Sequence, residues 1–187
     1  ADLTHDEIDS LRPEVYRYLS DNSNEILFKK VHDAYTCLPD GRPLFPTEAS
    51  RAAIYFIRNP FDLAISFAHH NARKPEEMID LINDSGYAFC RRKDRLFNQF
   101  RQKLGDWSFH VKSWTEQQKI PVLVLRYEDM KRDTFTAFKK AIQFLGIDKE
   151  DKKIKKAIEN SDLSVLKKQE TQNGFKEKMI KAESFFR

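Results

Sequence analysis

The chain has 187 residues, of which 40% are hydrophobic, 33% charged and 12% aromatic, and these values indicate one globular domain with a substantial core. Its formal net charge of +4 suits an anionic small ligand, but this excess is too small and too dispersed to indicate a nucleic-acid partner. No apolar run is long enough to span a membrane and no signal peptide is recognisable, so no membrane partner is expected.

The first predicted element is a helix over residues 4–20. Thr4 and Glu7 have the spacing of a capping box, in which each side chain satisfies a free backbone N–H of the other residue. Apolar residues follow at intervals of three and four, which is typical of a helix with one buried face. Pro13 is expected to bend this helix or split it into two pieces.

The next predicted element is a strand over residues 25–32. Side chains alternate in a strand, so Lys30 and His32 should project from one face near its carboxyl end. At a ligand-binding edge of a sheet they would supply a positive charge and a proton acceptor. The alternative is that they lie at a solvent-facing strand end without a chemical role.

The central stretch of the chain predicts an anion site. Residues 52–57 form an apolar run typical of a strand buried on both faces, and Arg58 follows at its carboxyl end. Asn59 suits the cap of a helix and Pro60 its first residue. A guanidinium, the N–H groups at the start of a helix and the hydroxyl of Ser66 could together bind a phosphate. Alternatively, Arg58 makes a surface salt bridge and Ser66 faces a neighbouring helix.

The remaining elements alternate between helix and strand. The spacing of apolar residues predicts helices over 75–83, 92–119 and 134–145, a buried strand over 121–127 and a lysine-rich, solvated helix face within 148–181. Gly105 is a possible interruption of the helix over 92–119. The order strand, helix, strand, helix predicts an α/β fold with a three-layer parallel sheet flanked by helices.

Five short segments resemble motifs of the cytosolic-type sulfotransferases, in the order of that family. The segments are Lys30-Val31-His32, then Arg58-Asn59-Pro60 with Asp62 and Ser66, then Gly105 to Trp114, then Tyr127-Glu128-Asp129-Met130, then Phe185-Phe186-Arg187. The resemblance covers residues 30–187 and implies a P-loop-hydrolase-like sulfotransferase fold in a cytoplasmic protein, with a bacterial-type member as the expectation.

The resemblance implies a binding site for 3′-phosphoadenosine 5′-phosphosulfate (PAPS). By analogy with the family motifs, Arg58, Ser66 and Arg187 would bind the 3′-phosphate and Tyr127 would contact the adenine. Ser161 stands where the family usually has a threonine near the base. The product would be 3′-phosphoadenosine 5′-phosphate (PAP).

The reaction implied is transfer of a sulfuryl group to a hydroxyl or amine of a small-molecule acceptor. His32 would be the general base, worth roughly 10²- to 10⁴-fold in rate, and Lys30 would stabilise the charge that develops on the sulfuryl group. No metal is expected. The sequence selects neither an acceptor nor an oligomeric state.

The chain departs from the family pattern at its start. None of its five glycines lies in a phosphate-binding loop, and the family places that loop upstream of the region matched by residues 25–32, which would be before Ala1. We therefore expect residues 1–187 to be a single sulfotransferase domain truncated at both ends, and a chain that begins at Ala1 to be inactive. Two alternatives stay open. One is an ATP-dependent kinase-like protein, whose only support is the acidic pair Glu128 and Asp129 as possible magnesium ligands, and the other is a catalytically inactive anion-binding domain.

Overall fold

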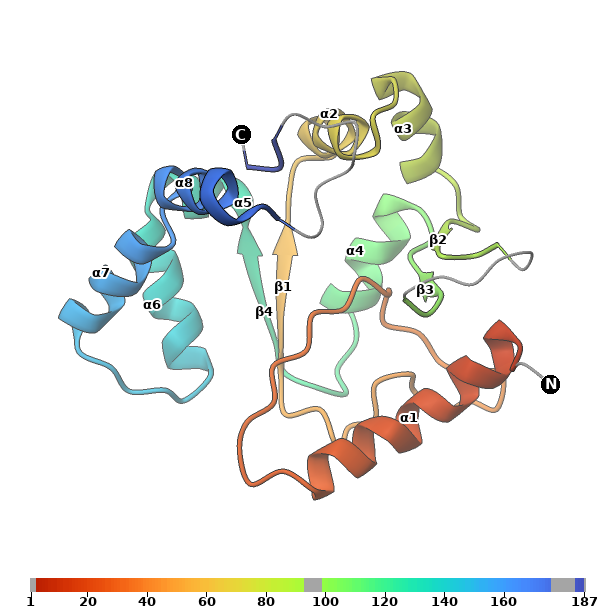
Figure 1. Cartoon of the computed structure of the whole chain (residues 1–187). Coiled ribbons are helices and arrows are strands. Elements are labelled where there is room, and N and C mark those ends of the chain that lie inside the picture. Colours follow the sequence, from red (N-terminus) through yellow and green to blue (C-terminus); the bar gives the residue numbers. More distant parts are fainter. Residues whose placement is uncertain (1–2, 93–98, 176–183, 187) are drawn as a thin grey trace. The chain divides into compact units, whose positions relative to one another are not determined.

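The computed structural model of the chain describes residues 3–92, 99–175 and 184–186. It divides into two compact units, the first made of Ala1–Tyr55 with Leu81–Val122 and the second of Phe56–Asp80 with Leu123–Arg187. The strands β1 (Ala53–Ile57) and β4 (Val122–Arg126) are neighbours in one sheet and run in the same direction (Figure 1). The predicted α/β class, with a parallel sheet and flanking helices, is confirmed.

The first unit contains the helices α1 (His5–Asp21) and α4 (Trp107–Thr115) and the short antiparallel pair β2 (Ala88–Phe89) and β3 (Gln102–Lys103). The capping box between Thr4 and Glu7 is present at the start of α1, as predicted. Pro13 is buried inside this helix and does not split it.

The core of the first unit is aromatic at its centre. Trp114 of α4 has its ring centroid 5.5 Å from that of Phe45 and 5.4 Å from that of Tyr35. Leu38, Leu44 and Ile120 complete the buried cluster, and Tyr55 of β1 packs against it. The apolar and aromatic spacing of residues 107–114 therefore packs α4 onto the loop that follows residue 33.

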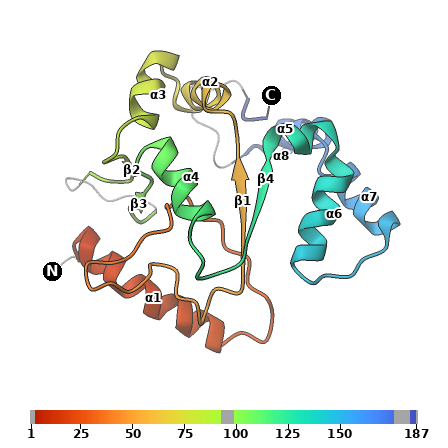
Figure 2. The same cartoon turned by 180° about the vertical axis from the view of Figure 1, so that it is seen from behind.

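The second unit contains α2 (Pro60–Asn71), α5 (Tyr127–Arg132), α6 (Thr134–Phe144), α7 (Asp151–Asn160) and α8 (Leu163–Asn173), while α3 (Pro75–Ile82) begins in it. The helices α6 and α7 lie side by side in both views (Figure 1 and Figure 2). An ion pair of 2.7 Å between Lys139 and Asp151 joins them. The lysine-rich stretch 148–181 is thus two helices in its described part, and residues 176–181 lie outside the described residues.

Residues 25–32 do not form a strand, contrary to the sequence prediction. The apolar side chains on which that prediction depended are exposed, with Ile26 46%, Leu27 45% and Phe28 67% accessible. A strand is stable only when a neighbouring strand accepts its backbone hydrogen bonds and a second layer covers its apolar face. In the described part of the chain no strand pairs with this segment, and of its apolar side chains Val31 packs against the core.

The helix predicted over 92–119 is interrupted at Gly105, as the sequence allowed, but its described part before that glycine is not helical, so the prediction is wrong there. Its described part holds β3 and α4, separated by a turn at Gly105, whose φ is +66°. A side chain at Gly105 would bring its Cβ within 2.5 Å of Cδ1 of Phe109. Asp106 then caps α4 by accepting from the N–H of Phe109 at 2.9 Å. The glycine and the cap outweigh the helical spacing on either side of them.

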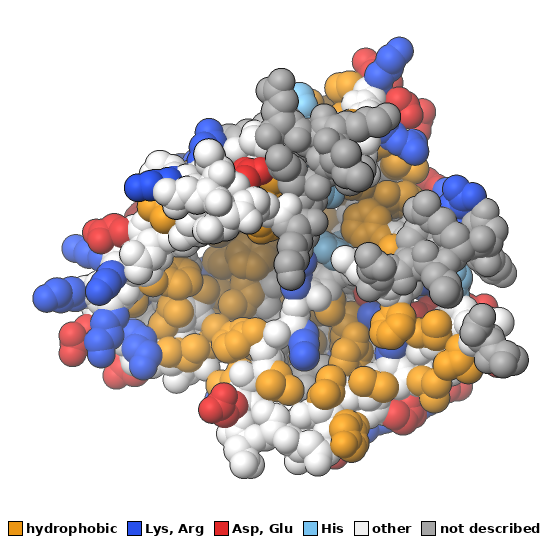
Figure 3. Space-filling view, in the orientation of Figure 1, with side chains coloured by type: hydrophobic (Ala, Val, Ile, Leu, Met, Phe, Trp, Pro, Cys, Tyr) orange, Lys and Arg blue, Asp and Glu red, His pale blue; other side chains and the backbone are white. Residues whose placement is uncertain are grey.

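The strand β1 is less covered than its apolar sequence predicts. Phe56 is 60% exposed, and apolar side chains lie open to solvent over much of the face shown in Figure 3. The sequence prediction of a strand buried on both faces is therefore wrong for this residue, although the strand itself is present.

Candidate functional site

The predicted junction between strand and helix is present at the end of β1. The side-chain oxygen of Asn59 accepts from the N–H of Phe61 at 3.0 Å, and Pro60 is the first residue of α2. The cap satisfies the N–H of Phe61, and the positive end of the helix dipole at the start of α2 favours a bound anion.

Arg58 is stacked on Tyr127. Its guanidinium carbon lies 4.5 Å from the centroid of the Tyr127 ring, which brings the carboxyl end of β1 to that of β4. The Nε of Arg58 is buried and has no hydrogen-bond partner among the described residues. A buried donor without a partner is costly, so this arrangement favours an acceptor such as a phosphate oxygen beside it. The surface ion pair considered as the alternative is absent from the described part of the chain.

Glu128 fixes the backbone next to Arg58. Its carboxylate accepts from the N–H of Asn59 at 2.9 Å, and this bond, with the nearby charges of Arg126 and Arg58, keeps the pKa of Glu128 below its usual value. The Tyr127-Glu128 segment therefore contributes an aromatic face and a backbone contact to the same site. The sequence placed Tyr127 beside the nucleotide only through its resemblance to a family motif.

The other predicted nucleotide residues of the second unit have different surroundings. Ser66 is exposed on α2, which contradicts its packing against a neighbouring helix. The hydroxyl of Ser161 lies 2.9 Å from the carbonyl oxygen of Ala157 and 3.2 Å from that of Ile158, so it would meet a ligand as an acceptor. Arg187 lies outside the described residues.

The segment before Arg187 is held by a carboxylate. Glu170 is 9% exposed and accepts from the N–H of Phe185 at 2.7 Å and from that of Phe186 at 3.0 Å. The ring of Phe185 also meets His70 of α2 edge-on, with the centroids 5.8 Å apart. The described end of the chain is thus attached to α2 and α8.

The predicted catalytic residues lie in the first unit. Lys30 and His32 are exposed and stand in an irregular segment, so strand alternation does not place them on one face. The ring of His32 meets that of Phe89 edge-on at 5.5 Å between centroids. Arg58 and Tyr127 belong to the second unit and are in contact there, whereas His32 belongs to the first unit.

Sequence reasoning gave His110 and Tyr55 no role. The Nε2 of His110 is 3.0 Å from the carbonyl oxygen of His32, and its Nδ1 is 2.9 Å from the hydroxyl of Tyr55. Burial lowers the pKa of His110 and raises the pKa of Tyr55 to about 12. The available signal was the position of His110 inside the Gly105 to Trp114 segment, which was read only as a motif and as core packing.

Residues 27–187 match the protein family described as "Sulfotransferase domain". The chain belongs to this sulfotransferase family. The match includes every predicted site residue and begins after α1, so the first helix lies outside the part that the family shares.

Several curated sulfotransferases resemble the chain. Cytosolic sulfotransferase 14 of Arabidopsis thaliana is 34% identical over 113 residues, 56% of this chain and 31% of that protein. Luciferin sulfotransferase of Photinus pyralis is 27% identical over 141 residues, 75% and 35% of the two chains, and sulfotransferase 2A6 of Rattus norvegicus is 28% identical over 138 residues, 71% and 44%. The chain thus spans less than half the length of these relatives, which are plant and animal proteins, and the expectation of a bacterial-type member stays a prediction.

A solved sulfotransferase shares the fold. The crystal structure of mouse sulfotransferase SULT7A1 complexed with PAP matches 66% of this chain and 44% of its own, with a TM-score of 0.50 and 28% sequence identity. Among the described residues there is neither a cluster of ligands that could hold a metal ion nor a helix long and apolar enough to cross a membrane.

Proposed function

We propose that the chain is the part of a PAPS-dependent sulfotransferase that recognises the 3′-phosphate of the nucleotide and carries the general base. The observation that carries this proposal is Arg58, stacked on Tyr127 at the start of α2 with a buried Nε that lacks a partner among the described residues. The PAP bound in the mouse relative supports the same class of ligand.

The nucleotide would be held by residues at the ends of β1 and β4 and by residues further along the chain. Arg58, Ser66 and Arg187 would bind the 3′-phosphate, Tyr127 would contact the adenine, and Ser161 would accept a hydrogen bond near the base. The guanidinium fork matches the geometry of phosphate oxygens, and its aromatic neighbour keeps it in one orientation.

His32 would act as the general base. PAPS supplies a sulfuryl group on a phosphate leaving group. As the bond between the acceptor oxygen and sulfur forms and the bond between sulfur and the 5′-phosphate oxygen breaks, the acceptor proton passes to the His32 imidazole. Lys30 would stabilise negative charge on the sulfuryl oxygens. This division of roles needs no metal, since the chain has mainly to position the partners and balance charge.

His110 is the other histidine beside this segment, but its contacts argue against a role as base. Its Nε2 must carry a proton to bond with the His32 carbonyl oxygen, which can only accept, so its Nδ1 accepts from the Tyr55 hydroxyl. Both ring nitrogens of His110 are therefore engaged within the chain, and the family motif at Lys30-Val31-His32 supports His32 as the base.

The acceptor would be a small molecule with a hydroxyl or amine, bound among residues 33–50, 72–91 and the segment after 169. We propose further that residues 1–187 act as one sulfotransferase domain in a cytoplasmic protein, a location supported by the relative named as cytosolic. A kinase-like reading is weakened because both acidic groups are engaged, Glu128 with the N–H of Asn59 and Asp129 with Arg132 at 3.3 Å.

Thermal unfolding with PAP and with ATP tests the class of nucleotide. At about 100 times its dissociation constant a ligand adds about 2.7 kcal/mol, which raises the melting temperature of a chain of this size by roughly 5–10 °C. We expect this shift with PAP and a smaller one with ATP. Stabilisation by ATP alone would exclude the sulfotransferase proposal, and equal stabilisation by PAP, ATP and inorganic sulfate would favour a domain that binds anions without selectivity.

A further inference from the structure

The backbone that follows His32 is held by hydrogen bonds from two elements, α4 and β3. Trp114 of α4 donates through its indole N–H to the carbonyl oxygen of Asp33 at 3.0 Å. The carbonyl oxygen of Lys103 in β3 accepts from the N–H of Ala34 at 2.8 Å, and the hydroxyl oxygen of Ser113 accepts from that of Tyr35 at 3.0 Å. We call residues 32–35 the anchored segment.

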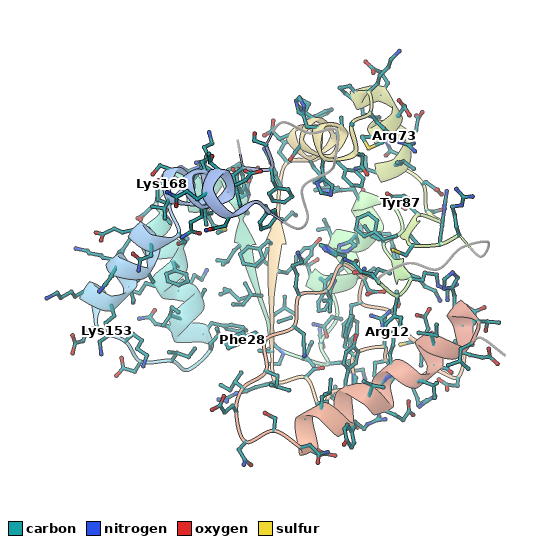
Figure 4. The ribbon with its side chains drawn as sticks, in the orientation of Figure 1. Arg12, Phe28, Arg73, Tyr87, Lys153 and Lys168 are labelled. Atoms are coloured by element: carbon teal, nitrogen blue, oxygen red, sulfur yellow. The ribbon has the colours of Figure 1, made fainter. Side chains whose placement is uncertain are left out.

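The side chain of Asp33 anchors the segment to α1. It is 1% exposed, and its two carboxylate oxygens accept from the two terminal nitrogens of Arg12 at 3.1 and 2.8 Å. Arg12 is 8% exposed and points into the first unit (Figure 4). One carboxylate oxygen also accepts from the N–H of Lys103 at 2.9 Å. A two-point pair of this kind fixes orientation as well as distance.

His110 holds the carbonyl group at the start of the anchored segment. Its Nε2–H donates to the carbonyl oxygen of His32 at 3.0 Å, and the hydroxyl of Tyr55 fixes the ring by donating to its Nδ1 at 2.9 Å. The rings of Tyr55 and His110 are also stacked, with centroids 5.7 Å apart. The imidazole is therefore held in one tautomer and one plane, as a group that positions another residue requires.

We propose that His110 is a positioning residue for His32. It would hold the His32 carbonyl oxygen by a hydrogen bond, while the ion pair between Arg12 and Asp33 holds the next residue in place. With the carbonyl oxygen and the next residue both held, the peptide plane that carries the Cα of His32 has a defined place and orientation. This inference rests on the proposed role of His32 as base, but the hydrogen bond itself does not.

Two variants of His110 separate positioning from packing. In His110→Gln the amide nitrogen occupies roughly the place of Nε2 and can still donate to the His32 carbonyl oxygen, whereas in His110→Asn the side chain is too short to reach it. His5→Asn is the matched control, because His5 lies in the same unit with its Nε2 3.2 Å from the carbonyl oxygen of Arg92, outside the anchored segment.

The first measurement is the carbonyl carbon resonance of His32, read through the amide of Asp33 in the 187-residue chain. We expect an upfield shift in His110→Asn, as a hydrogen bond to that oxygen is lost, and little change in His110→Gln or His5→Asn. An unchanged resonance in His110→Asn would overturn the proposal whatever the activity of the protein.

The second measurement is turnover in the full-length protein beside the dissociation constant for PAP. We expect His110→Asn to lower kcat about 10- to 100-fold, which is less than the full contribution of a general base because His32 is misplaced and not removed, with PAP affinity unchanged and kcat largely restored in His110→Gln. Wild-type kcat in a folded His110→Asn protein would overturn the proposal. If the wild-type protein neither bound PAP nor transferred a sulfuryl group, the proposed function would fail, and the carbonyl resonance would still decide whether His110 fixes the anchored segment.

Discussion

At the scale of single residues, two side chains have surroundings that differ from those of ordinary surface groups. Arg58 lies 4.5 Å from the ring centroid of Tyr127 with a buried Nε, and His110 has both ring nitrogens engaged. A cation over an aromatic ring gains about 0.5–2 kcal/mol, which is enough to favour one orientation of a long side chain. Both arrangements prepare a group before any ligand binds, which lowers the cost of ordering it on binding.

The buried imidazole of His110 predicts a pH dependence of stability. Burial lowers its pKa in the folded chain below the ordinary value of 6.5, although the His32 carbonyl oxygen and Asp33 act in the opposite direction. Below pH 6.5 the unfolded chain binds more protons at this position, so its contribution to stability is complete above that pH and declines as the pH falls toward the folded value.

Urea unfolding at pH 5.5 and 7.5 measures this effect, with His110→Gln as the variant that cannot titrate. The wild-type chain should lose more stability on acidification than His110→Gln does, because only the wild type must protonate this ring on unfolding. The same loss in both chains would show that His110 is equally easy to protonate in the folded and unfolded states.

The sequence predicted the place of Arg58 but not its partner. A strand end, a cap and a helix start are local features, so residues 52–66 were enough to predict them, and the structure has all three. The stack on Tyr127 and the contact from Glu128 join parts of the chain 69 residues apart, and spacing holds no information about such pairs. The contacts of His110 with Tyr55 and His32, which are 55 and 78 residues away, were missed for the same reason.

At the scale of elements, the start of α2 positions the proposed phosphate site, and the Asn59 cap should contribute to the stability of the chain. Asn59→Ala should lower the free energy of unfolding by about 0.5–2 kcal/mol, because the N–H of Phe61 loses its acceptor. Asn59→Asp keeps a capping oxygen and should remain close to the wild type. Denaturant unfolding of the three chains decides this, and equal stability of Asn59→Ala and the wild type would show that the cap contributes nothing.

The helix α1 is tied to the anchored segment by a buried ion pair. Arg12→Met should cost about 3–5 kcal/mol, because it leaves the carboxylate of Asp33 buried without its charged partner. Arg42→Met is the control, because the Arg42 side chain is 38% exposed and pairs with Asp40 at 2.7 Å, and it should cost clearly less than Arg12→Met. Urea unfolding measures both losses. Comparable losses of stability in the two variants would show that burial does not make the Arg12 pair more important for stability than the Arg42 pair.

The two wrong element predictions have separate physical causes. The strand over 25–32 was predicted from its composition, but a strand needs a hydrogen-bonded neighbour, and composition cannot say whether one is present. The helix over 92–119 was predicted from periodicity with a possible break at Gly105, but periodicity reports apolar spacing and does not say on which side of that glycine the helix lies. At Gly105 the positive φ and the contact that a Cβ would make with Phe109 set the boundary instead.

At the scale of the whole molecule, the chain divides into two compact units of similar size, with the proposed base in one and the proposed nucleotide residues in the other. Differential scanning calorimetry tests the prediction that residues 1–187 act as one domain. A single transition, with equal calorimetric and van't Hoff enthalpies, is the expected result. Two resolved transitions would show that the units unfold independently.

If Arg58 binds the 3′-phosphate of the nucleotide, its removal should abolish the preference for ligands that carry this group. Titration calorimetry would compare PAP with adenosine 5′-phosphate, which lacks the 3′-phosphate, on the wild type and Arg58→Ala. Arg73→Ala is the control, since Arg73 is an exposed arginine of the same unit that pairs with Glu77 (Figure 4).

The wild type and Arg73→Ala should bind PAP about 10- to 150-fold more tightly than adenosine 5′-phosphate, the range expected for hydrogen bonds to a charged group. Arg58→Ala should lose most of this preference while its affinity for adenosine 5′-phosphate stays near that of the wild type. A full wild-type preference for PAP in Arg58→Ala would contradict the account.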